Sequence, residues 1–452
     1  MKGSLGARMS YQGALEYINS FTDFEKIASL RIEPFDLTRI RRLLEAVESP
    51  HLHGQVFHIA GTKGKGSTAA MLSSILQADG YRTGLFTSPH LHSFRERIRL
   101  NGRPISQQDL TALVERARPL VDELHADGSL GQITTFELTT LLAFLYFEDA
   151  GAEVRILEAG LGGRLDATNV VNPLLAIITS ISLDHTSILG TTLRQVASEK
   201  AGIIKPGGTI VSASQPEEAA EVIRQTCRER GARLVVVGKD VGWRRISAGM
   251  NGQIAHVRTS AGDYHFEIPL LGKFQCENVA VVVAAVQEAR ALGLPISPRS
   301  VATGLRQVSW PGRMQVLQHN PLVLVDGAHN VHSAAVLRET VREDLSFRRC
   351  IMVLGTSVDK DLTGIAGELA PLTDAVIATR SRHPRSADPM RVAGEFQALG
   401  KEVRTAPDTA SAIGAALELA SPTDLILVTG SLFIVAEALE WAGLAEVTDP
   451  VS

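Results

Sequence analysis

The sequence predicts an α/β protein with two domains, each built on a mainly parallel sheet that helices cover on both faces. Two observations predict this class. Apolar, strand-like runs alternate with helical patterns along most of the chain, and 452 residues are too many for one compact core. The net charge of −4, with 44% hydrophobic and 21% charged residues, gives no indication of binding to nucleic acid or to a membrane surface.

The first predicted domain covers residues 1–311 and opens with a strand, a helix and a strand at 55–61, 67–79 and 83–88. A long helical pattern over 134–151 ends at a glycine, as helices often do. Four further apolar runs follow: "VRILEAG" (154–160), "LLAIITSI" (174–181), "TIVSA" (209–213) and "RLVVVG" (233–238). Continuous apolar strands separated by helices are typical of a parallel sheet.

The pattern changes from 241 to 268, where short alternating segments are joined by Asn-Gly and Gly-Asp turns. These segments predict a small antiparallel accessory sheet, followed by a helix over 274–292. Pro311 and Gly312 mark a break. Behind it, at 312–452, we predict a smaller Rossmann-like α/β domain with strands at "LVLVDGAHN" (322–330), "CIMVLGTS" (350–357), "AVIATRS" (375–381), "EVRTA" (402–406) and "LILVTGS" (425–431).

The compartment is indicated by what the sequence lacks. No apolar run approaches the roughly 20 residues of a membrane span, and residues 1–13 lack the apolar core of a signal peptide. The three cysteines, Cys227, Cys276 and Cys350, are far apart and read as buried thiols. We therefore expect a cytoplasmic protein without membrane or nucleic-acid partners. Separately, we expect a monomer.

The segment "AGTKGKGST" (60–68) has the order of a phosphate-binding loop, with glycine-rich backbone between a strand and a helix. Glycines let backbone N–H groups converge on an anion, and the helix N-terminus adds about half a unit of positive charge. The match to G-x-x-x-x-G-K-[ST] is incomplete, because Ile59 replaces the first glycine and Gly66 separates Lys65 from Ser67. A tight turn without a ligand is the alternative, although such a turn needs no paired lysines.

Charged residues follow two of the predicted strands. Glu158 ends one strand, and Asp184 and His185 follow the next. A carboxylate at this end of a parallel strand points toward the crevice where ligands bind, and one carboxylate can suffice for Mg²⁺. The alternatives are a salt-bridged glutamate and a structural histidine. Lys200, in "VASEKAGIIKPG", reads on composition alone as part of a solvated Glu-Lys helix face.

Several of these segments resemble the folylpolyglutamate synthase and dihydrofolate synthase family, a branch of the Mur ligases. "HIAGTKGKGSTAA" (58–70) is similar to the family's P-loop, with Lys63 where Asn is usual. "LEAGLGGRLDATNVV" (157–171) is nearly identical to a family segment, and Ser88 to Leu91 match its Ser-Pro-His-Leu loop. The resemblance runs in order from about residue 11 to 440.

The resemblance implies roles for individual residues. Catalytic roles fall to Lys65, Lys200, His185 and His329. The nucleotide is expected at Thr62, Lys63, Gly64, Lys65, Gly66, Ser67, Asn278, Arg313 and Asp326. One or two Mg²⁺ ions are expected on Ser88, Glu158, His185 and a carbamylated Lys200. The pterin side of the substrate is expected along Thr134, Thr135, Phe136, Glu137, Leu165, Asp166 and Ala167.

The implied activity is that of an ATP-dependent ligase. The carboxylate of a folate, or of dihydropteroate, would take the γ-phosphoryl group of ATP, and the amine of L-glutamate would displace phosphate from the acyl phosphate. Two alternatives stay open at this point: a Mur-type ligase acting on a nucleotide-sugar peptide, and a P-loop ATPase that hydrolyses ATP only to change shape. Gly66, placed before the hydroxyl residue, disfavours the first alternative.

Overall fold

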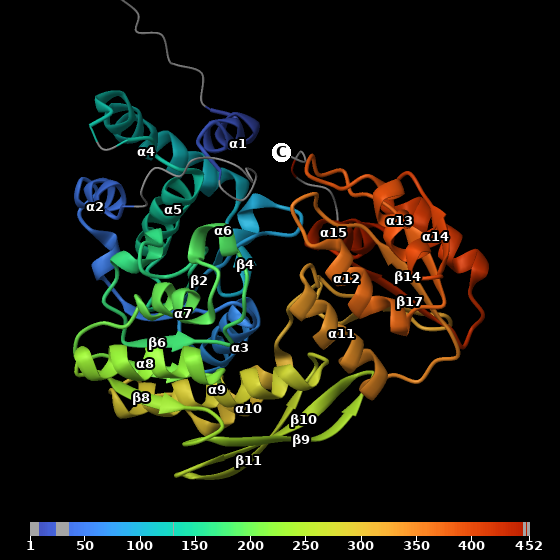
Figure 1. Ribbon diagram of the computed structural model, residues 1–452. Helices are drawn as coiled ribbons and strands as arrows, with labels where there is room; N and C mark the ends of the chain where they lie inside the picture. Colours follow the sequence, from blue (N-terminus) through green and yellow to red (C-terminus); the bar gives the residue numbers. More distant parts are fainter. Residues whose placement is uncertain (1–8, 24–35, 130, 446–448, 450–452) are drawn as a thin grey trace, which may run out of the picture. The chain divides into compact units, whose positions relative to one another are not determined.

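The computed structural model describes residues 9–23, 36–129, 131–445 and 449. The segment 1–13, on which the expectation about a signal peptide rests, therefore lies largely outside the described residues. The chain forms two compact units (Figure 1). Unit 1 comprises the described residues of Met1–His90, Arg95–Asp240 and Val281–Gly304, and unit 2 comprises those of Leu91–Phe94, Val241–Ala280 and Leu305–Ser452.

Unit 1 contains an eight-stranded sheet in the order β4-β3-β2-β5-β1-β6-β7-β8. Its strands are β1 (Gln55–Ala60), β2 (Thr83–Phe86), β3 (Ile98–Leu100), β4 (Arg103–Pro104), β5 (Val154–Glu158), β6 (Leu175–Ile178), β7 (Thr209–Ser212) and β8 (Arg233–Val236). The pairs from β2 to β8 are parallel, and β3 and β4 add an antiparallel edge. β1, β2, β5, β6 and β7 are buried almost throughout, as strands covered on both faces are.

Helices connect these strands and cover the sheet. They are α1 (Tyr11–Asn19), α2 (Thr38–Glu45), α3 (Lys65–Ala78), α4 (Gln107–Asp127), α5 (Thr135–Asp149), α6 (Thr186–Leu189), α7 (Leu193–Ala201) and α8 (Glu217–Glu229). Two further helices, α9 (Lys273–Ala291) and α10 (Pro298–Gln307), have residues in both units. α7 and α8 pack on β6 and β7 around Ile178, Val196 and Ile210.

The strand order places β1 between β5 and β6, so the connections from β1 to β2 and from β5 to β6 run in opposite directions. In open α/β sheets, ligands bind outside the carboxyl ends of the strands at such a reversal. The loop that follows β1 is the predicted P-loop. It therefore begins at the position in the sheet where a ligand is expected.

Unit 2 holds a six-stranded sheet in the order β12-β13-β17-β14-β15-β16, parallel except for the β12–β13 pair. Its elements are β12 (Gln315–Gln318), β13 (Leu322–Val325), α11 (Val331–Asp344), β14 (Cys350–Leu354), α12 (Leu362–Leu369), β15 (Ala375–Ala378), α13 (Pro389–Ala398), β16 (Glu402–Thr405), α14 (Thr409–Leu419), β17 (Leu425–Thr429) and α15 (Leu432–Trp441). It also includes the accessory hairpins β9 (Gly242–Gly249), β10 (Gly252–Thr259) and β11 (Gly262–Ile268), which pair antiparallel.

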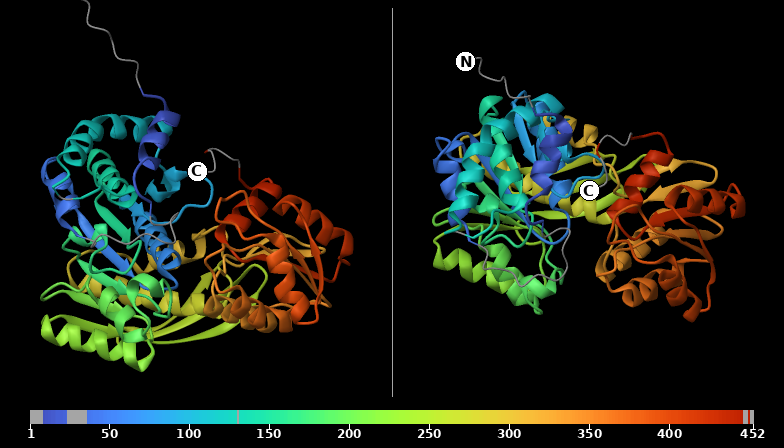
Figure 2. Two further views of the ribbon diagram at one scale, coloured as in Figure 1. Left: turned by 45° about the horizontal axis from the view of Figure 1, so that its top comes forward. Right: turned by 90° about the horizontal axis from the view of Figure 1, so that it is seen from above.

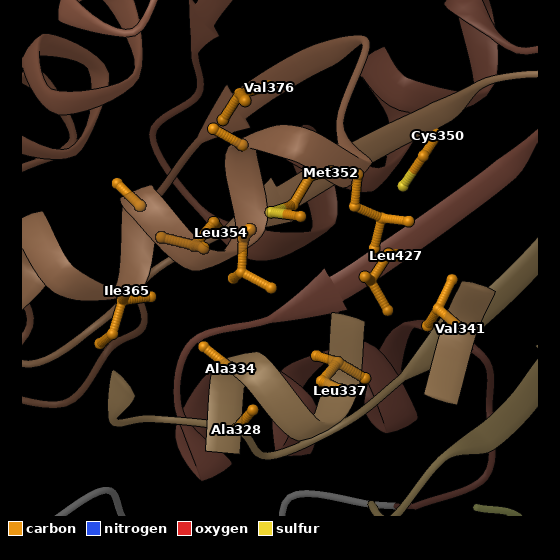
Figure 3. Close-up of a cluster of buried hydrophobic side chains, with 14 of the residues drawn as sticks. Ala328, Ala334, Leu337, Val341, Cys350, Met352, Leu354, Ile365, Val376 and Leu427 are labelled. Carbon is orange, nitrogen blue, oxygen red and sulfur yellow. The ribbon is translucent and has the colours of Figure 1, made fainter. Parts of the chain in front are cut away.

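Alternate residues of the unit 2 strands enter two separate cores. Met352, Leu354 and Leu427 point to the face covered by α11, α12 and α13 (Figure 3). Ile351 and Val353 point to the other face, against α14 and α15. Figure 2 shows the orange and red helices of this unit on the outside of its sheet from two further directions. This period of two along each strand is the reason for the three-layer arrangement.

The predicted fold class is confirmed, and the differences are local. β3 and β4 were not predicted, because strands of two or three residues carry no pattern. α3 begins at Lys65, two residues before the predicted start, and α10 has already ended at Gln307, before the break at Pro311. The three cysteines are buried and free, as predicted. No helix in the described part of the chain is long and apolar enough to cross a membrane.

Candidate active site

The P-loop turns sharply away from β1 at Gly61, whose φ is +149°. A Cβ atom at this position would lie 1.9 Å from Thr179 Oγ1, so no larger residue fits. The backbone N–H groups of Thr62 and Lys63 both donate to Ser180 O, at 2.9 and 3.1 Å. Gly64 then takes the left-handed conformation that caps α3, with φ of +88°. The glycines are thus used for backbone geometry, as predicted for a loop that cradles an anion.

Lys65 is the first residue of α3, and its side chain reaches toward β5. Its Nζ lies 3.6 Å from Glu158 Oε1, and the two side chains are 17% and 6% exposed. The separation is that of an ion pair rather than a hydrogen bond. The neighbouring strands β1 and β5 thus bring together the predicted phosphate lysine and the predicted metal carboxylate.

The loop after β6 is attached to the P-loop by a second set of contacts. Thr62 Oγ1 donates to Ser182 O at 3.0 Å and accepts from Ser182 N at 3.1 Å. Lys63 Nζ lies 3.1 Å from Asp184 Oδ2. Asp184 Oδ1 accepts from the backbone N–H of His185 at 3.0 Å, and His185, which precedes α6, has a left-handed φ of 49°. The structure therefore brings the predicted residues Lys63 and His185 together through one carboxylate.

Lys200 lies beneath the P-loop. Its side chain is buried, and Nζ donates to Gly61 O at 2.8 Å. Burial, followed by the charge of nearby Lys65, lowers the pKa of Lys200 to about 7. The interpretation of Lys200 as part of a solvated face is therefore wrong. Its neighbour Glu199 makes the outward contact instead, an ion pair with Arg164 at 2.9 Å.

The predicted substrate segment Thr134, Thr135, Phe136 and Glu137 forms the start of α5. Thr134 and Glu137 form a capping box, in which each side chain bonds the other residue's backbone N–H. Glu137 also pairs with Arg39 Nε at 3.0 Å, with both side chains less than a tenth exposed. Burial raises the pKa of Glu137, although Arg39 acts in the opposite direction. Phe136 lies against Gly160, where a Cβ atom would be 2.7 Å from the ring.

The second predicted substrate segment contains half-buried Leu165 and buried Asp166 and Ala167. Asp166 accepts from the backbone N–H groups of Leu161 and Thr168, at 2.9 and 3.0 Å. Thr168 Oγ1 also donates to Asp166 and lies 2.8 Å from His58 Nε2 in β1. This carboxylate therefore organises the glycine-rich loop that follows β5.

Ser88 lies in the loop after β2, half-buried, and precedes a cis peptide bond to Pro89. Within the same loop, Arg97 Nε donates to His90 Nδ1 at 2.9 Å, so His90 is an acceptor at that nitrogen. No group of three or more His, Cys, Asp or Glu side chains able to hold a metal ion occurs within 9–23, 36–129, 131–445 and 449.

Comparison with known proteins decides the family. The Mur ligase middle domain matches residues 59–286, and the Mur ligase glutamate ligase domain matches residues 312–432. The dihydrofolate synthase/folylpolyglutamate synthase of Bacillus subtilis is 34% identical over 431 residues, 95% of this chain and 98% of its own length. The chain belongs to the folylpolyglutamate synthase/dihydrofolate synthase family of the Mur ligases.

Other relatives of this family agree. A probable bifunctional folylpolyglutamate synthase/dihydropteroate synthase of Haloferax volcanii is 37% identical over 409 residues, and this chain, 88% of which is matched, spans only 47% of that relative. The solved structure of Mycobacterium tuberculosis folylpolyglutamate synthase complexed with ADP matches with a TM-score of 0.88 and 32% identity, over 96% of this chain and 98% of that one. Escherichia coli FolC in complex with DHPP and ADP matches with a TM-score of 0.82 and 30% identity, over 94% and 97%.

The residues that the family resemblance singles out in unit 2 lie at strand and helix ends. Asp326 follows β13, and its oxygens accept from the N–H groups of Met314 and Ala328 at 3.0 and 2.9 Å. His329 Nδ1 lies 2.8 Å from Gly327 O. Asn278 donates to Gln275 at 2.9 Å within α9. Arg313 lies close to Gly327, where a Cβ atom would be 2.6 Å from its guanidinium.

Sequence reasoning did not single out the residues that support this site from behind, although the segment "FDLTRIRRLL" (35–44), which contains Arg39, stands where the family resemblance implies a further pterin contact. Arg39 and Thr168 are buried partners of predicted residues, and His58 is fully buried in β1. Their partners lie 98 to 110 residues away or within a loop, so no local pattern marks them. His58 alone carried a signal, because it is a polar residue within the apolar strand that leads into the P-loop.

Proposed function

We propose that the chain is an ATP- and Mg²⁺-dependent ligase that adds L-glutamate to the carboxylate of a folate, and that the same site accepts dihydropteroate. The observation that carries the proposal is the meeting of Lys65, the first residue of α3, with Glu158 at the end of β5, 3.6 Å apart. Phosphoryl transfer needs a cation and a carboxylate, and here both lie at the N-terminus of α3, which follows the glycine-rich loop. The family membership supports the choice of acceptor and amine.

The chain's own groups account for the handling of the nucleotide. The N-terminus of α3 and Lys65 neutralise the terminal phosphates, and the left-handed Gly64 leads into the first turn of α3, whose backbone N–H groups would face them. The folate carboxylate attacks the γ-phosphorus, ADP leaves, and the amine of glutamate then attacks the acyl carbon. Phosphate departs with the bonding electrons, and the amine loses one proton.

The residues at this edge of the sheet fit Mg²⁺. Glu158 offers a buried carboxylate, and magnesium commonly takes one or two protein carboxylates together with water and phosphate oxygens. We propose that Glu158 holds the ion, with Ser88 and His185 near it. When bound, the ion withdraws charge from the transferring phosphoryl group. The ion pair with Lys65 keeps Glu158 oriented toward the P-loop.

We further propose that Lys200 reacts with carbon dioxide to form a carbamate. An amine with a pKa of about 7 is partly neutral at neutral pH, and only the neutral amine is nucleophilic. Its hydrogen bond to Gly61 O holds the amine next to the P-loop. The mass of the intact protein, measured with and without bicarbonate by native mass spectrometry, tests this proposal, and an unchanged mass contradicts it.

The substrate side is proposed along the starts of α5 and of the loop after β5. Thr134, Thr135, Phe136 and Leu165 would contact the pterin, with Ala167 behind them. Glu137 and Asp166, whose oxygens are already engaged by protein donors, would act by holding these walls in place.

The remaining roles stay proposals. They are Asn278 for adenine, Asp326 for ribose, Arg313 and His329 for phosphate, and a boundary between a 1–311 ATP-binding domain and a 312–452 glutamate ligase domain.

We also infer that the protein is a monomer and that it belongs to a reducing compartment such as the cytoplasm. The free buried cysteines support the reducing compartment. Light scattering tests the monomer.

The activity is tested by phosphate release from ATP in the presence of Mg²⁺, L-glutamate and either tetrahydrofolate or dihydropteroate. Release that needs both the acceptor and glutamate, with a product heavier by one glutamyl group, is expected. Release that ignores both substrates would contradict the proposal and favour an ATPase switch. Glu158→Gln should lower the rate by about 10²-fold or more. The matched control is Glu123→Gln, an exposed glutamate of α4, which should leave the rate unchanged.

A further inference from the structure

The P-loop carries three lysines in or beside it, and each has a different partner. Lys65 faces Glu158, Lys200 donates to Gly61 O, and Lys63 faces Asp184. Only Lys63 departs from the residue usual at its position in the family. Its partner Asp184 follows β6, so the pair joins two loops that belong to neighbouring strands.

The Lys63–Asp184 pair is close and mostly shielded from water. Nζ and Oδ2 are 3.1 Å apart, and the side chains are 25% and 12% exposed. At this separation the pair combines a hydrogen bond with charge attraction, which partial burial strengthens. To reach a phosphate, the ammonium group of Lys63 would have to leave the carboxylate of Asp184. That carboxylate would stay shielded from water but would lose Lys63 as its counter-ion.

The same carboxylate also determines the backbone of His185. Asp184 Oδ1 accepts from the N–H of His185, and this residue has a left-handed conformation, with φ of 49° and ψ of 42°. Left-handed backbone is uncommon for residues other than glycine and needs local support. Four further hydrogen bonds hold the two loops together: Thr62 N and Lys63 N each donate to Ser180 O, and Thr62 Oγ1 donates to Ser182 O and accepts from Ser182 N.

We propose that Lys63 is a positioning residue, which fixes the loop 180–185 and the backbone of His185 against the P-loop through Asp184, and which does not bind the nucleotide itself. The proposal rests on the proposed function only in treating His185 as a group near the metal. Where the family usually has a neutral asparagine, this chain then has Lys63, which forms an ion pair with Asp184. The role predicted for Lys63 from the sequence, direct contact with the nucleotide, is the alternative.

A double-mutant cycle separates the two roles, because the effects of Lys63→Met and Asp184→Asn add only if the residues act independently. Two measurements apply to the full chain and need no ligase activity. One is the Kd of ADP in the presence of EDTA, by calorimetry. The other is the Kd of Mn²⁺ for the ADP complex, by electron paramagnetic resonance. Lys239→Met, an exposed lysine, is the matched control.

We expect both single variants to weaken Mn²⁺ binding by about fivefold or more, the double variant to be no weaker than either, and Lys63→Arg to recover most of the loss. The metal-free Kd of ADP should stay within about twofold. A metal-free Kd raised about tenfold by Lys63→Met, and raised equally in the Asp184→Asn background, would overturn the proposal. If the protein lacks ligase activity but the double-mutant cycle gives the expected Kd values, only the proposed function is contradicted.

Discussion

Replacing Arg39 by Met should destabilise unit 1 in a way that depends on pH. The guanidinium pairs with Glu137 at 3.0 Å in a place where the two side chains are 8% and 7% exposed. Methionine keeps the apolar stem but leaves the carboxylate buried without its counter-ion. Removing one partner of a buried ion pair typically costs about 3–5 kcal/mol, which corresponds to a lower unfolding midpoint by about 6–20 °C.

The pH dependence follows from the direction of the pKa shift. Burial already raises the pKa of Glu137, and Arg39 opposes this, so the variant raises the pKa further. Between the unfolded and folded pKa values the folded chain binds more protons than the unfolded chain, so stability falls as pH rises through that window. The stability difference between Arg39→Met and the parent should therefore be larger at pH 8 than at pH 5.

Calorimetry and far-UV circular dichroism at both pH values measure this difference. Arg39→Met with Glu137→Gln should recover part of the loss, because no charge is then left buried. Arg116→Met is the control, since its ion pair with Asp149 at 2.9 Å is about half exposed and should contribute less than about 1 kcal/mol. Equal losses in the two arginine variants, or a loss that does not change with pH, would refute the reasoning.

Three further changes test other parts of the structure. Gly61→Ala places a Cβ atom 1.9 Å from Thr179 Oγ1, and should weaken ADP binding by about tenfold or more in calorimetry, whereas Gly367→Ala, with no atom near its Cβ, should be neutral or slightly stabilising. Gly160→Ala, whose Cβ would be 2.7 Å from Phe136, should raise the KM for the folate while the Kd of ADP stays unchanged, and the reverse pattern would contradict the proposed substrate side. Asp424→Asn should lower the free energy of unfolding of unit 2 by about 1–2 kcal/mol at pH 7, because burial raises the pKa of Asp424 but the hydrogen bonds from Arg348, Ser421 and Arg349 outweigh it and hold the pKa below its usual value. That stability is present above the unfolded pKa and is lost as pH falls through the lowered folded pKa, so the difference should be smaller at pH 3 than at pH 7, and an equal difference at the two pH values would contradict this assignment.

The parts of the fold that the sequence predicted are those with a repeated local pattern. Buried parallel strands are apolar throughout, and this is visible in β1, β5, β6 and β17 without knowledge of their neighbours. β3 and β4 were not visible, because their form depends on pairing with the edge of β2. The start of α3 was misplaced because Gly66 disfavours a helix, whereas the left-handed Gly64 caps it there.

The residues of the candidate site also fall into two groups, those that a local pattern predicts and those that only tertiary packing places. Lys65 and Glu158 were predictable, since Glu158 ends β5, Lys65 comes shortly after β1, and the carboxyl ends of neighbouring parallel strands lie at one edge of the sheet. Arg39 was not, because an arginine on an amphipathic helix usually faces solvent, and only the packing of α2 on α5 buries it beside Glu137. The burial of Lys200 was not predictable from composition either, because it comes from the packing of α7 under the P-loop, where Nζ donates to Gly61 O.

A buried polar chain connects the two sides of the site, and its protonation can be deduced. Thr168 Oγ1 donates to Asp166, so it must accept at its contact with His58, and Nε2 of His58 therefore carries the proton. Burial, followed by the charge of Lys205, lowers the pKa of His58 to about 3, so the ring is neutral. Nδ1 is then an unprotonated nitrogen, so the buried ring atom without a hydrogen-bond partner in the part of the chain that the structure describes is an acceptor and not an N–H donor. His58 belongs to β1, three residues before Gly61, and Asp166 holds the loop after β5. The hydrogen bonds His58–Thr168–Asp166 therefore fix the P-loop strand relative to the proposed pterin wall, and the imidazole between them is neutral.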